Sequence, residues 1–406
     1  MSRLVAVIVI AGCSSPTADV LTARQIPTDL QPDVASVVTA NNQFACDAYG
    51  ALVSGDQNLV FSPFSIATAF AMLDAGAAGQ SDAELRTAFH VSLPGDRAHA
   101  AYGALLTSLA TGRDFGQYTL ATADKLFGQQ GFPFLDAFVS TTRDDYQAEM
   151  QPVDFADDPD GVIDTIDHWV SDQTDGKIPM LFQHGDLDSS TVLAIVNAIL
   201  FKGTWEQHFD HDATHDGPFH KADGSTATAS LMQREGSISM GAIPGGRIGV
   251  MPFNGKDIDM VVLLPDAADG LPALESQLTG DAIAGWIANA SPADDAAVVL
   301  PKFGVTSAFD LPSTMQALGV TTIFDPATAD LSGIDGARDL YVNKVVHQAM
   351  ITVDEDGAEA AAATGIGVGD TSAPVPFEAD HPFIFMIHDA VTGSILFMGR
   401  VADPSS

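Results

Sequence analysis

The stretch DEDGAEAAAATGIGVGDTSAPVPF, residues 354–377, carries almost no large side chain, yet it lies between two apolar stretches. Counted in steps of two from Ala358, one side reads Ala, Ala, Ala, Thr, Ile, Val, while the other starts with Glu359 and ends in glycines. Strict alternation is typical of a strand with one buried face. Alanine and glycine have poor strand propensity, however, and Gly357 lets the backbone bend at the start. The segment is therefore predicted to be a loop that can insert into a sheet as a strand.

Helical spacing of apolar residues is concentrated early in the chain, and strand-like apolar runs come mostly later. The expected helices are 33–53, 62–79 and 160–176. The expected strands are 191–201, 259–265, 296–303, 340–355 and 383–389. Residues 191–201 are apolar on both faces, so this strand is expected in the middle of a covered sheet. No Pro- or Gly-rich linker divides residues 33–404, which predicts one large α+β domain.

The first thirteen residues, MSRLVAVIVIAGC, have the pattern of an export signal. Arg3 precedes an apolar run, residues 4–10, that is too short to cross a bilayer as a helix. Residues 10–13 resemble the bacterial lipobox, which implies cleavage before Cys13 and a lipid on its thiol. An ordinary secretory signal with an incidental cysteine is the alternative.

This N-terminus predicts three regions: a signal peptide (1–12), a flexible tether rich in Ser, Thr, Pro and Asp (13–32), and the folded domain (33–404). We expect an exported protein, either held on a membrane of the cell envelope through Cys13 or extracellular. After Cys13 only Cys46 remains, so the chain cannot form an internal disulfide bond. Cys46 lies among apolar residues at helical spacing and is expected to be an inert core thiol.

The charge of the chain limits its partners. Lys and Arg number 17 against 53 Asp and Glu, a formal net charge of −36. A surface with this balance repels polyanions, so neither nucleic acid nor a heparin-like polymer is an expected partner. A solvated, solubilising surface is the simplest interpretation, and we expect a monomer.

Signals for an enzyme or a cofactor are weak. GIGVGD (365–370) lacks the third glycine of a nucleotide loop, DEDG (354–357) does not continue as a calcium loop, and no cofactor is expected. Four histidines, at two spacings that suit a metal, share one acidic stretch, where a solvated loop is the alternative. These are His208, His211, His215 and His220.

Two serines, an asparagine and a histidine form a second candidate set. Arranged in space they would resemble a hydrolase site, but nothing near either serine marks it as a nucleophile. The alternative is a buried, hydrogen-bonded polar cluster. The four residues are Ser62, Ser65, Asn197 and His347.

Several motifs together resemble the serpin family over residues 33–404. DEDGAEAAAATG resembles the hinge of the serpin reactive-centre loop, and FEADHPFIFMIHDAVTGSILFMGRVADP resembles the C-terminal signature. NLVFSPFSIATAFAML, VNAILFKGTWEQHF and LYVNKVVHQAMITVDEDG also match the family. The resemblance implies three β-sheets, about nine helices and an exposed reactive-centre loop (355–376). It also implies irreversible inhibition of a serine protease rather than an enzymatic activity.

The resemblance assigns roles to individual residues. Ser62, Ser65, Asn197 and His347 match the shutter beneath the central sheet. Trp205 and Lys302 match the breach, where the loop first enters that sheet, and Lys302 pairs with Glu355. The hinge residues are Glu355, Gly357, Ala358, Ala360 and Ala362. The sequence departs from the family at Ala358, where Thr or Ser is usual, and at Asp124, where Asn is usual.

The bond that the target protease would cleave is located by two counts taken from the family. One count places the residue before the bond fourteen positions after Gly357, and the other places it six positions before Phe377. Both counts reach Thr371. The expected bond is Thr371–Ser372, and a small uncharged residue before it suits an elastase- or subtilisin-like protease. Asp370 in that role would suit an Asp-specific protease instead. Two alternatives remain: a non-inhibitory serpin that acts as a chaperone or binding module, and an unrelated enzyme or solute-binding lipoprotein.

Overall fold

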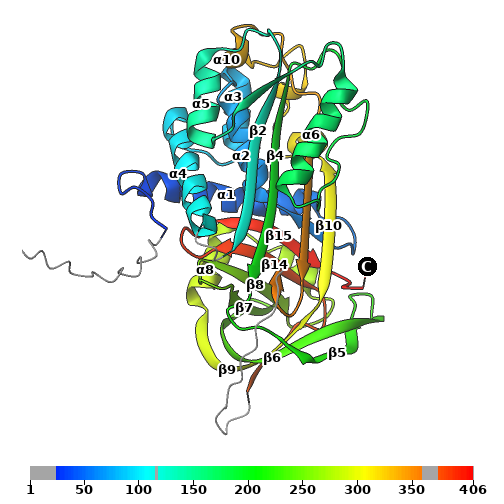
Figure 1. Cartoon of the computed structure of the whole chain (residues 1–406). Helices are drawn as coiled ribbons and strands as arrows, with labels where there is room; N and C mark the ends of the chain where they lie inside the picture. The colour runs from blue at the N-terminus through cyan, green and yellow to red at the C-terminus, as the bar shows by residue number, and fades with distance from the viewer. Residues whose placement is uncertain (1–23, 115–117, 359–373, 406) are drawn as a thin grey trace, which may run out of the picture.

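The computed structural model describes residues 24–114, 118–358 and 374–405, and it has the mixed helix and sheet architecture that the sequence predicts (Figure 1). Ten α-helices and one 3-10 helix lie within these ranges, one α-helix more than the expected nine. They are α1 (Gln31–Leu52), α2 (Pro63–Asp74), α3 (Gly79–Ala88), α4 (Gly95–Asp114), α5 (Asp136–Tyr146), α6 (Pro159–Gln173), α7 (Leu271–Glu275), α8 (Gly280–Asn289), α9 (Pro312–Ala317), α10 (Ser332–Asp335) and the 3-10 helix Thr322–Phe324.

The strands of the described ranges form three sheets, as expected. The largest has nine strands in the order β1-β15-β14-β8-β7-β6-β9-β13, with β5 paired to β6. Its strands are β1 (Leu59–Phe61), β5 (Asp210–His220), β6 (Thr226–Ile243), β7 (Gly246–Pro252), β8 (Ile258–Pro265), β9 (Ser291–Pro301), β13 (Val375–Glu378), β14 (Phe383–Asp389) and β15 (Ile395–Val401).

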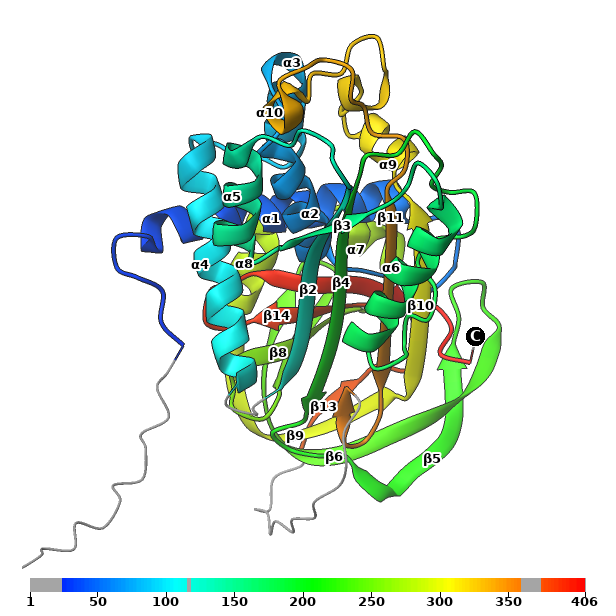
Figure 2. The same cartoon turned by 45° about the horizontal axis from the view of Figure 1, so that its top comes forward.

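The two smaller sheets lie side by side along the long axis of the molecule (Figures 1 and 2). One has the order β12-β4-β2-β3, the other pairs β10 with β11, and β11 contacts β4. Their strands are β2 (Thr119–Gln129), β3 (Met150–Val153), β4 (Leu193–Thr204), β10 (Phe303–Asp310), β11 (Val346–Val353) and β12 (Gly357–Ala358). We call these six strands together the central sheet.

Strand β4 is covered on both faces, as its apolar sequence predicts. Ala194 and Val196 pack with the buried face of α6, which includes Ile163 and Ile166. The alternate residues of β4 pack into the main core, to which α2 contributes. Side chains of a strand point alternately to its two faces, so a strand buried on both must be apolar throughout.

The strand expected over 340–355 is shorter in the structure and begins only at Val346. Strand β10 supplies its hydrogen bonds, and the last residue of β10, Asp310, pairs with Val346. Beyond that point the chain turns into α9, and Leu311 N donates to Val345 O at 2.9 Å. Residues 341–345 therefore have no ladder partner and stay irregular, although their composition is that of a strand.

The expected tether, residues 13–32, is described only from Arg24, and this end lies against the folded body. Arg24 is buried and forms a bidentate ion pair with Asp389, with nitrogen–oxygen distances of 2.7 and 2.8 Å. Arg24 Nε also donates to Ser108 O in α4 at 2.9 Å. The lipidation residue Cys13 lies outside the described residues. Among the helices that are described, none has the length and apolar character that a bilayer crossing requires.

Cys46 is buried in α1, as expected of a core thiol. Burial raises the pKa of this thiol to about 12. At neutral pH it is therefore protonated, and a protonated thiol is a poor nucleophile.

Candidate functional site

The hinge begins inside the central sheet. Gly357 and Ala358 form β12, which pairs antiparallel with Thr204 and Gly203 at the end of β4. Ala358 is 1% exposed, so its methyl group faces the core, as the alternation predicts. Gly357 has φ +150°, and a Cβ at this position would collide with the carbonyl of Gly203. Only glycine fits here without strain.

A tight turn, residues 354–356, joins β11 to β12, and Trp205 holds it. The indole Nε1 donates to Asp354 O and the Trp205 backbone N to Asp356 O, both at 2.9 Å. The indole is buried and stacks on Phe253 with ring centroids 4.6 Å apart. The residue assigned to the breach is therefore in direct contact with the hinge.

Lys302 and Glu355 form the ion pair that the family resemblance implies, with Nζ 2.6 Å from Oε2. The Glu355 side chain is buried, and that of Lys302 is partly exposed. Burial alone would raise the pKa of Glu355, but the hydrogen bond from Lys302 and further hydrogen bonds lower it below its usual value. The carboxylate is therefore charged at neutral pH and fixes the hinge turn to the start of β10.

The four histidines do not gather at one point. His208 and His211 approach the hinge turn, while His215 Nδ1 contacts Ala213 O and His220 lies at the end of β5. Within the described ranges, no group of three or more His, Cys, Asp or Glu side chains is arranged to hold a metal ion. The structure thus separates the cluster that the sequence suggests.

The four shutter residues come together behind the central sheet. Ser62 N donates to His347 Nε2 at 3.0 Å, and Ser62 Oγ donates to Leu396 O at 2.6 Å. Ser65 Oγ donates to Asn197 Oδ1. Burial lowers the pKa of His347 to about 4, so the ring is neutral at physiological pH. Neither serine hydroxyl bonds to the histidine, so the cluster lacks the nucleophile–base pair of a hydrolase.

Asp124 extends this cluster onto β2. Asn197 Nδ2 donates to Asp124 Oδ1 at 2.6 Å, so the asparagine links Ser65 to the carboxyl group. Burial raises the pKa of Asp124 to about 7, and the bond from Asn197 offsets this only in part. Among the described residues, no Lys or Arg forms an ion pair with it. The family's usual asparagine would carry no charge here.

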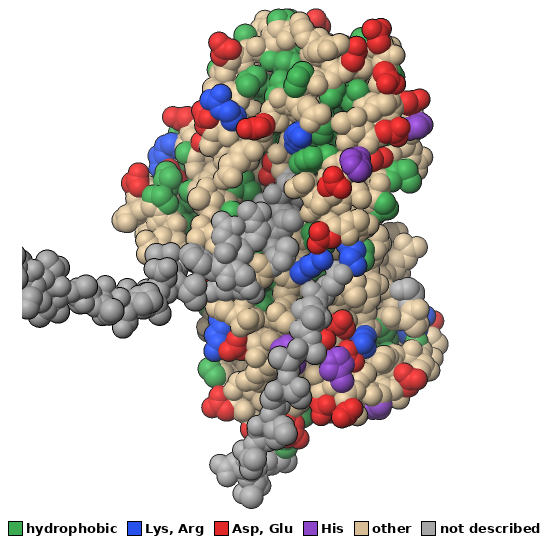
Figure 3. All heavy atoms as spheres, viewed as in Figure 1, with side chains coloured by type: hydrophobic (Ala, Val, Ile, Leu, Met, Phe, Trp, Pro, Cys, Tyr) green, Lys and Arg blue, Asp and Glu red, His purple; other side chains and the backbone are tan. Residues whose placement is uncertain are grey.

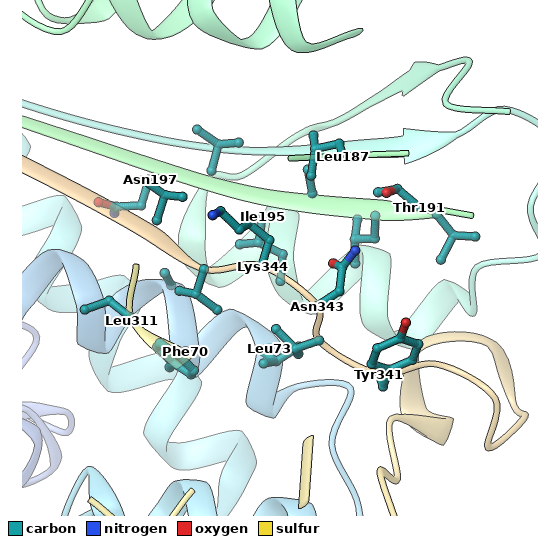
Figure 4. A pocket seen from close by; sticks show the side chains of 18 of the residues that line it. Phe70, Leu73, Leu187, Thr191, Ile195, Asn197, Leu311, Tyr341, Asn343 and Lys344 are labelled. Atoms are coloured by element: carbon teal, nitrogen blue, oxygen red, sulfur yellow. The ribbon is translucent and has the colours of Figure 1, made fainter. Parts of the chain in front are cut away.

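A cavity of about 180 Å³ lies beyond the shutter, between β4 and the irregular residues 341–345. Figure 4 shows Ile195 and Asn197 on β4, Lys344 on the segment that faces it, and Phe70 of α2 below them in the view. Lys344 Nζ lies 3.2 Å from both Asp186 and Asp310. At its C-terminal end β4 is therefore paired with β12, whereas along residues 193–197 it borders the cavity.

The reactive bond, Thr371–Ser372, and the hinge residues Ala360 and Ala362 lie outside the described residues. Both flanks of this segment are described. Strand β12 lies at the C-terminal end of β4, and β13 pairs parallel with β9 at the same end of the molecule (Figure 2). Phe377 of β13 is fully buried and packs over Gly249. The two flanks of the segment therefore belong to two different sheets.

The surface agrees with the composition. Figure 3 shows carboxylates scattered over the visible face with fewer cationic side chains, and histidines beside carboxylates in its lower part. Sequence reasoning missed two features: the burial of Arg24 and the approach of His208 and His211 to Asp356. The acidic neighbours of the histidines suggested exposure, and nothing in the sequence linked residues about 150 positions apart.

Comparisons with known proteins agree with this geometry. A family profile described as "Serpin (serine protease inhibitor)" matches residues 39–404. The leukocyte elastase inhibitor of Bos taurus is 39% identical over 377 residues, 90% of this chain and 98% of that protein. The leukocyte elastase inhibitor of Homo sapiens is 36% identical over 381 residues, 90% and 99% of the two chains.

Two solved structures show the same fold. Uncleaved ovalbumin aligns with a TM-score of 0.82 at 29% identity, covering 91% of this chain and 100% of that chain. Maspin aligns with a TM-score of 0.84 at 26% identity, covering 92% and 100%. With a family profile over residues 39–404 and relatives that are 36% and 39% identical over 90% of its length, the chain belongs to the serpin family.

Proposed function

We propose that this serpin irreversibly inhibits a serine protease of elastase- or subtilisin-like preference. The observation that carries the proposal is the pairing of β12 with β4. The hinge is held where an inserted strand has to begin, and the residues that follow Ala358 are small on the inward side. The names of the related leukocyte elastase inhibitors support a target that cleaves after small residues.

In the proposed mechanism the serine of the target attacks the carbonyl carbon of Thr371, the Thr371–Ser372 peptide bond breaks, and Ser372 leaves with a protonated amino group as Thr371 becomes ester-linked to the protease. The freed loop then inserts between β4 and β11 while the protease is still bound as an acyl-enzyme. A new strand of about a dozen residues adds a similar number of ladder hydrogen bonds, each worth about 1 kcal/mol net. Burial of the inward side chains adds to this, so insertion releases on the order of 10 kcal/mol. The intact fold is a kinetic trap, and this energy distorts the protease.

The test is the formation of a covalent complex with an elastase-type protease. An inhibitory serpin gives a band on a denaturing gel at the summed mass, and the protease loses activity. A non-inhibitory serpin gives only the cleaved chain, and the protease stays active. The second outcome would favour the chaperone or binding-module alternative.

The site of first cleavage is a separate prediction. Limited digestion with an elastase-like protease is expected to release a C-terminal peptide that begins at Ser372, because Thr371 is the small residue reached by both counts from the family. Mass spectrometry of the peptide measures this directly. A first cut more than one residue away would contradict the assignment of Thr371.

We also propose that the protein is exported and anchored to a membrane through acyl chains on Cys13. The support is the N-terminal sequence alone, an apolar run followed by a lipobox-like Ile-Ala-Gly-Cys. Cys13→Ser is expected to move the protein from the membrane fraction to the soluble fraction, because several acyl chains on one residue give durable binding. Cys46→Ser, which alters only the buried thiol, is the control. Fractionation that leaves the Cys13 variant on the membrane would contradict the anchor.

A further inference from the structure

Two histidines, His208 between β4 and β5 and His211 in β5, face one carboxylate of the hinge turn. His211 Nε2 lies 3.2 Å and His208 Nδ1 3.5 Å from the same oxygen, Oδ1 of Asp356. His211 Nδ1 lies 3.8 Å from Glu355 Oε2. We call His208, His211 and Lys302 the hinge seat, because they surround the two acids of the turn.

Asp356 depends on these histidines for a cationic neighbour. Lys302 pairs with Glu355, and no Lys or Arg of the described residues pairs with Asp356. His208 Nδ1 is buried and has no hydrogen-bond partner in this arrangement. A ring hydrogen on that nitrogen would be directed at a carboxylate within ion-pair distance. Protonation of His211 therefore adds a charge-assisted contact to a carboxylate that has no Lys or Arg partner among the described residues.

The surrounding charges favour protonation of His211. A hydrogen bond to Asp356 raises the pKa of His211 above its usual value, and the negative charges of Asp356 and Glu355 raise it further. Partial burial and the positive charge of Lys302 lower this pKa, but their effect is smaller. On the β6 side Arg234 is buried, donates to Gln207 Oε1 and lies over the ring of Phe209. Asp210 and Asp212, next to His211 on β5, are exposed acids. A histidine whose pKa is raised by a partner strengthens that contact below its usual pKa, and the gain is lost as pH rises through the raised pKa.

We propose that the hinge seat is a pH-dependent device that keeps β12 paired with β4, an inference that rests on the proposed function. When His211 is protonated it holds Asp356, and the turn 354–356 stays at the end of β4. Insertion then starts from a strand that is already in register. As pH rises through the raised pKa of His211, this ring loses its charge and the turn leaves the sheet more often. Each insertion then has to begin from an unpaired hinge.

Hydrogen–deuterium exchange of residues 354–358 in the intact protein tests the seat without any protease. Protection, corrected for intrinsic exchange with an unstructured peptide, is expected to fall about two- to fivefold between pH 6 and pH 8 as His211 loses its charge. In the variants His211→Gln and Asp356→Asn, protection at pH 6 and at pH 8 is expected to equal the low value that the native protein has at pH 8. His215→Gln is the matched control, because its ring lies on the same strand and faces Ala213 O.

Three results would overturn the seat: protection in the native protein that does not fall with pH, a pH response that survives in His211→Gln and Asp356→Asn, or loss of the response in His215→Gln. Inhibition gives the second readout, since the moles of serpin used per mole of protease inactivated are expected to rise with pH in the native protein and not in His211→Gln. If no covalent complex forms at any pH, the proposed function fails, while the exchange experiment still decides the seat.

Discussion

Ala360→Arg is expected to convert the inhibitor into a substrate. Ala360 lies two residues after Ala358, whose side chain is buried in the central sheet, so the alternation directs it inward on insertion. Insertion would bury an unpaired guanidinium at a cost of several kcal/mol. Each 1.4 kcal/mol added to the barrier slows insertion about tenfold, so a slowing on the order of 100-fold or more is expected. Hydrolysis of the acyl-enzyme then overtakes insertion.

The matched variant is Ala361→Arg, which places the same charge on the side that faces solvent. The measurement is the number of moles of serpin consumed per mole of protease inactivated, with recovery of the chain cleaved after Thr371. We expect a large increase for Ala360→Arg and little change for Ala361→Arg. Equal loss in both variants would show that the alternation does not set the inward face. No loss in either would show that the segment does not insert.

The fold could be predicted because its signals are local. The apolar run 191–201 specifies burial on both faces through the spacing of a few neighbouring residues, and β4 is covered on both faces. The irregular conformation of residues 341–345 could not be predicted, because their composition is that of a strand. Whether they form one depends on β10, which turns away at Leu311. A strand needs a partner, and the sequence does not state where the partner ends.

The contacts of the site were only partly predictable, for the same reason. The family resemblance brought Lys302 to Glu355, and the structure has that pair. It gave no reason to join Arg24 to Asp389, 365 positions apart, or His211 to Asp356. Single charged residues carry no periodic pattern, so their partners are known only once the fold places them. Asp124 was visible in the sequence as a departure from the family, and its consequence required the neighbours that the structure supplies.

Asp124→Asn is expected to stabilise the intact protein at pH 8. Burial raises the pKa of this carboxyl to about 7, well above the usual value near 3.8 that the unfolded chain retains. The folded state therefore binds a proton more tightly than the unfolded state. Stability from this group is complete below about pH 4, falls as pH rises, and is lost above about pH 7. Asparagine is neutral throughout, and its side-chain oxygen can still accept the hydrogen bond from Asn197.

The expected gain in unfolding free energy over the native protein is on the order of 2–4 kcal/mol at pH 8 and near zero at pH 4, measured by urea unfolding. Asp74 also has a pKa raised to about 7, chiefly by burial, but it is unchanged in both proteins, so the difference between them isolates Asp124. The control is Asp175→Asn: this exposed carboxylate bonds to Lys202, its pKa is lowered, and its removal brings no gain at pH 8. An equal gain at both pH values would mean that the charge of Asp124 is not the cause. No gain at pH 8 would mean that the carboxyl group stays hydrated in the shutter.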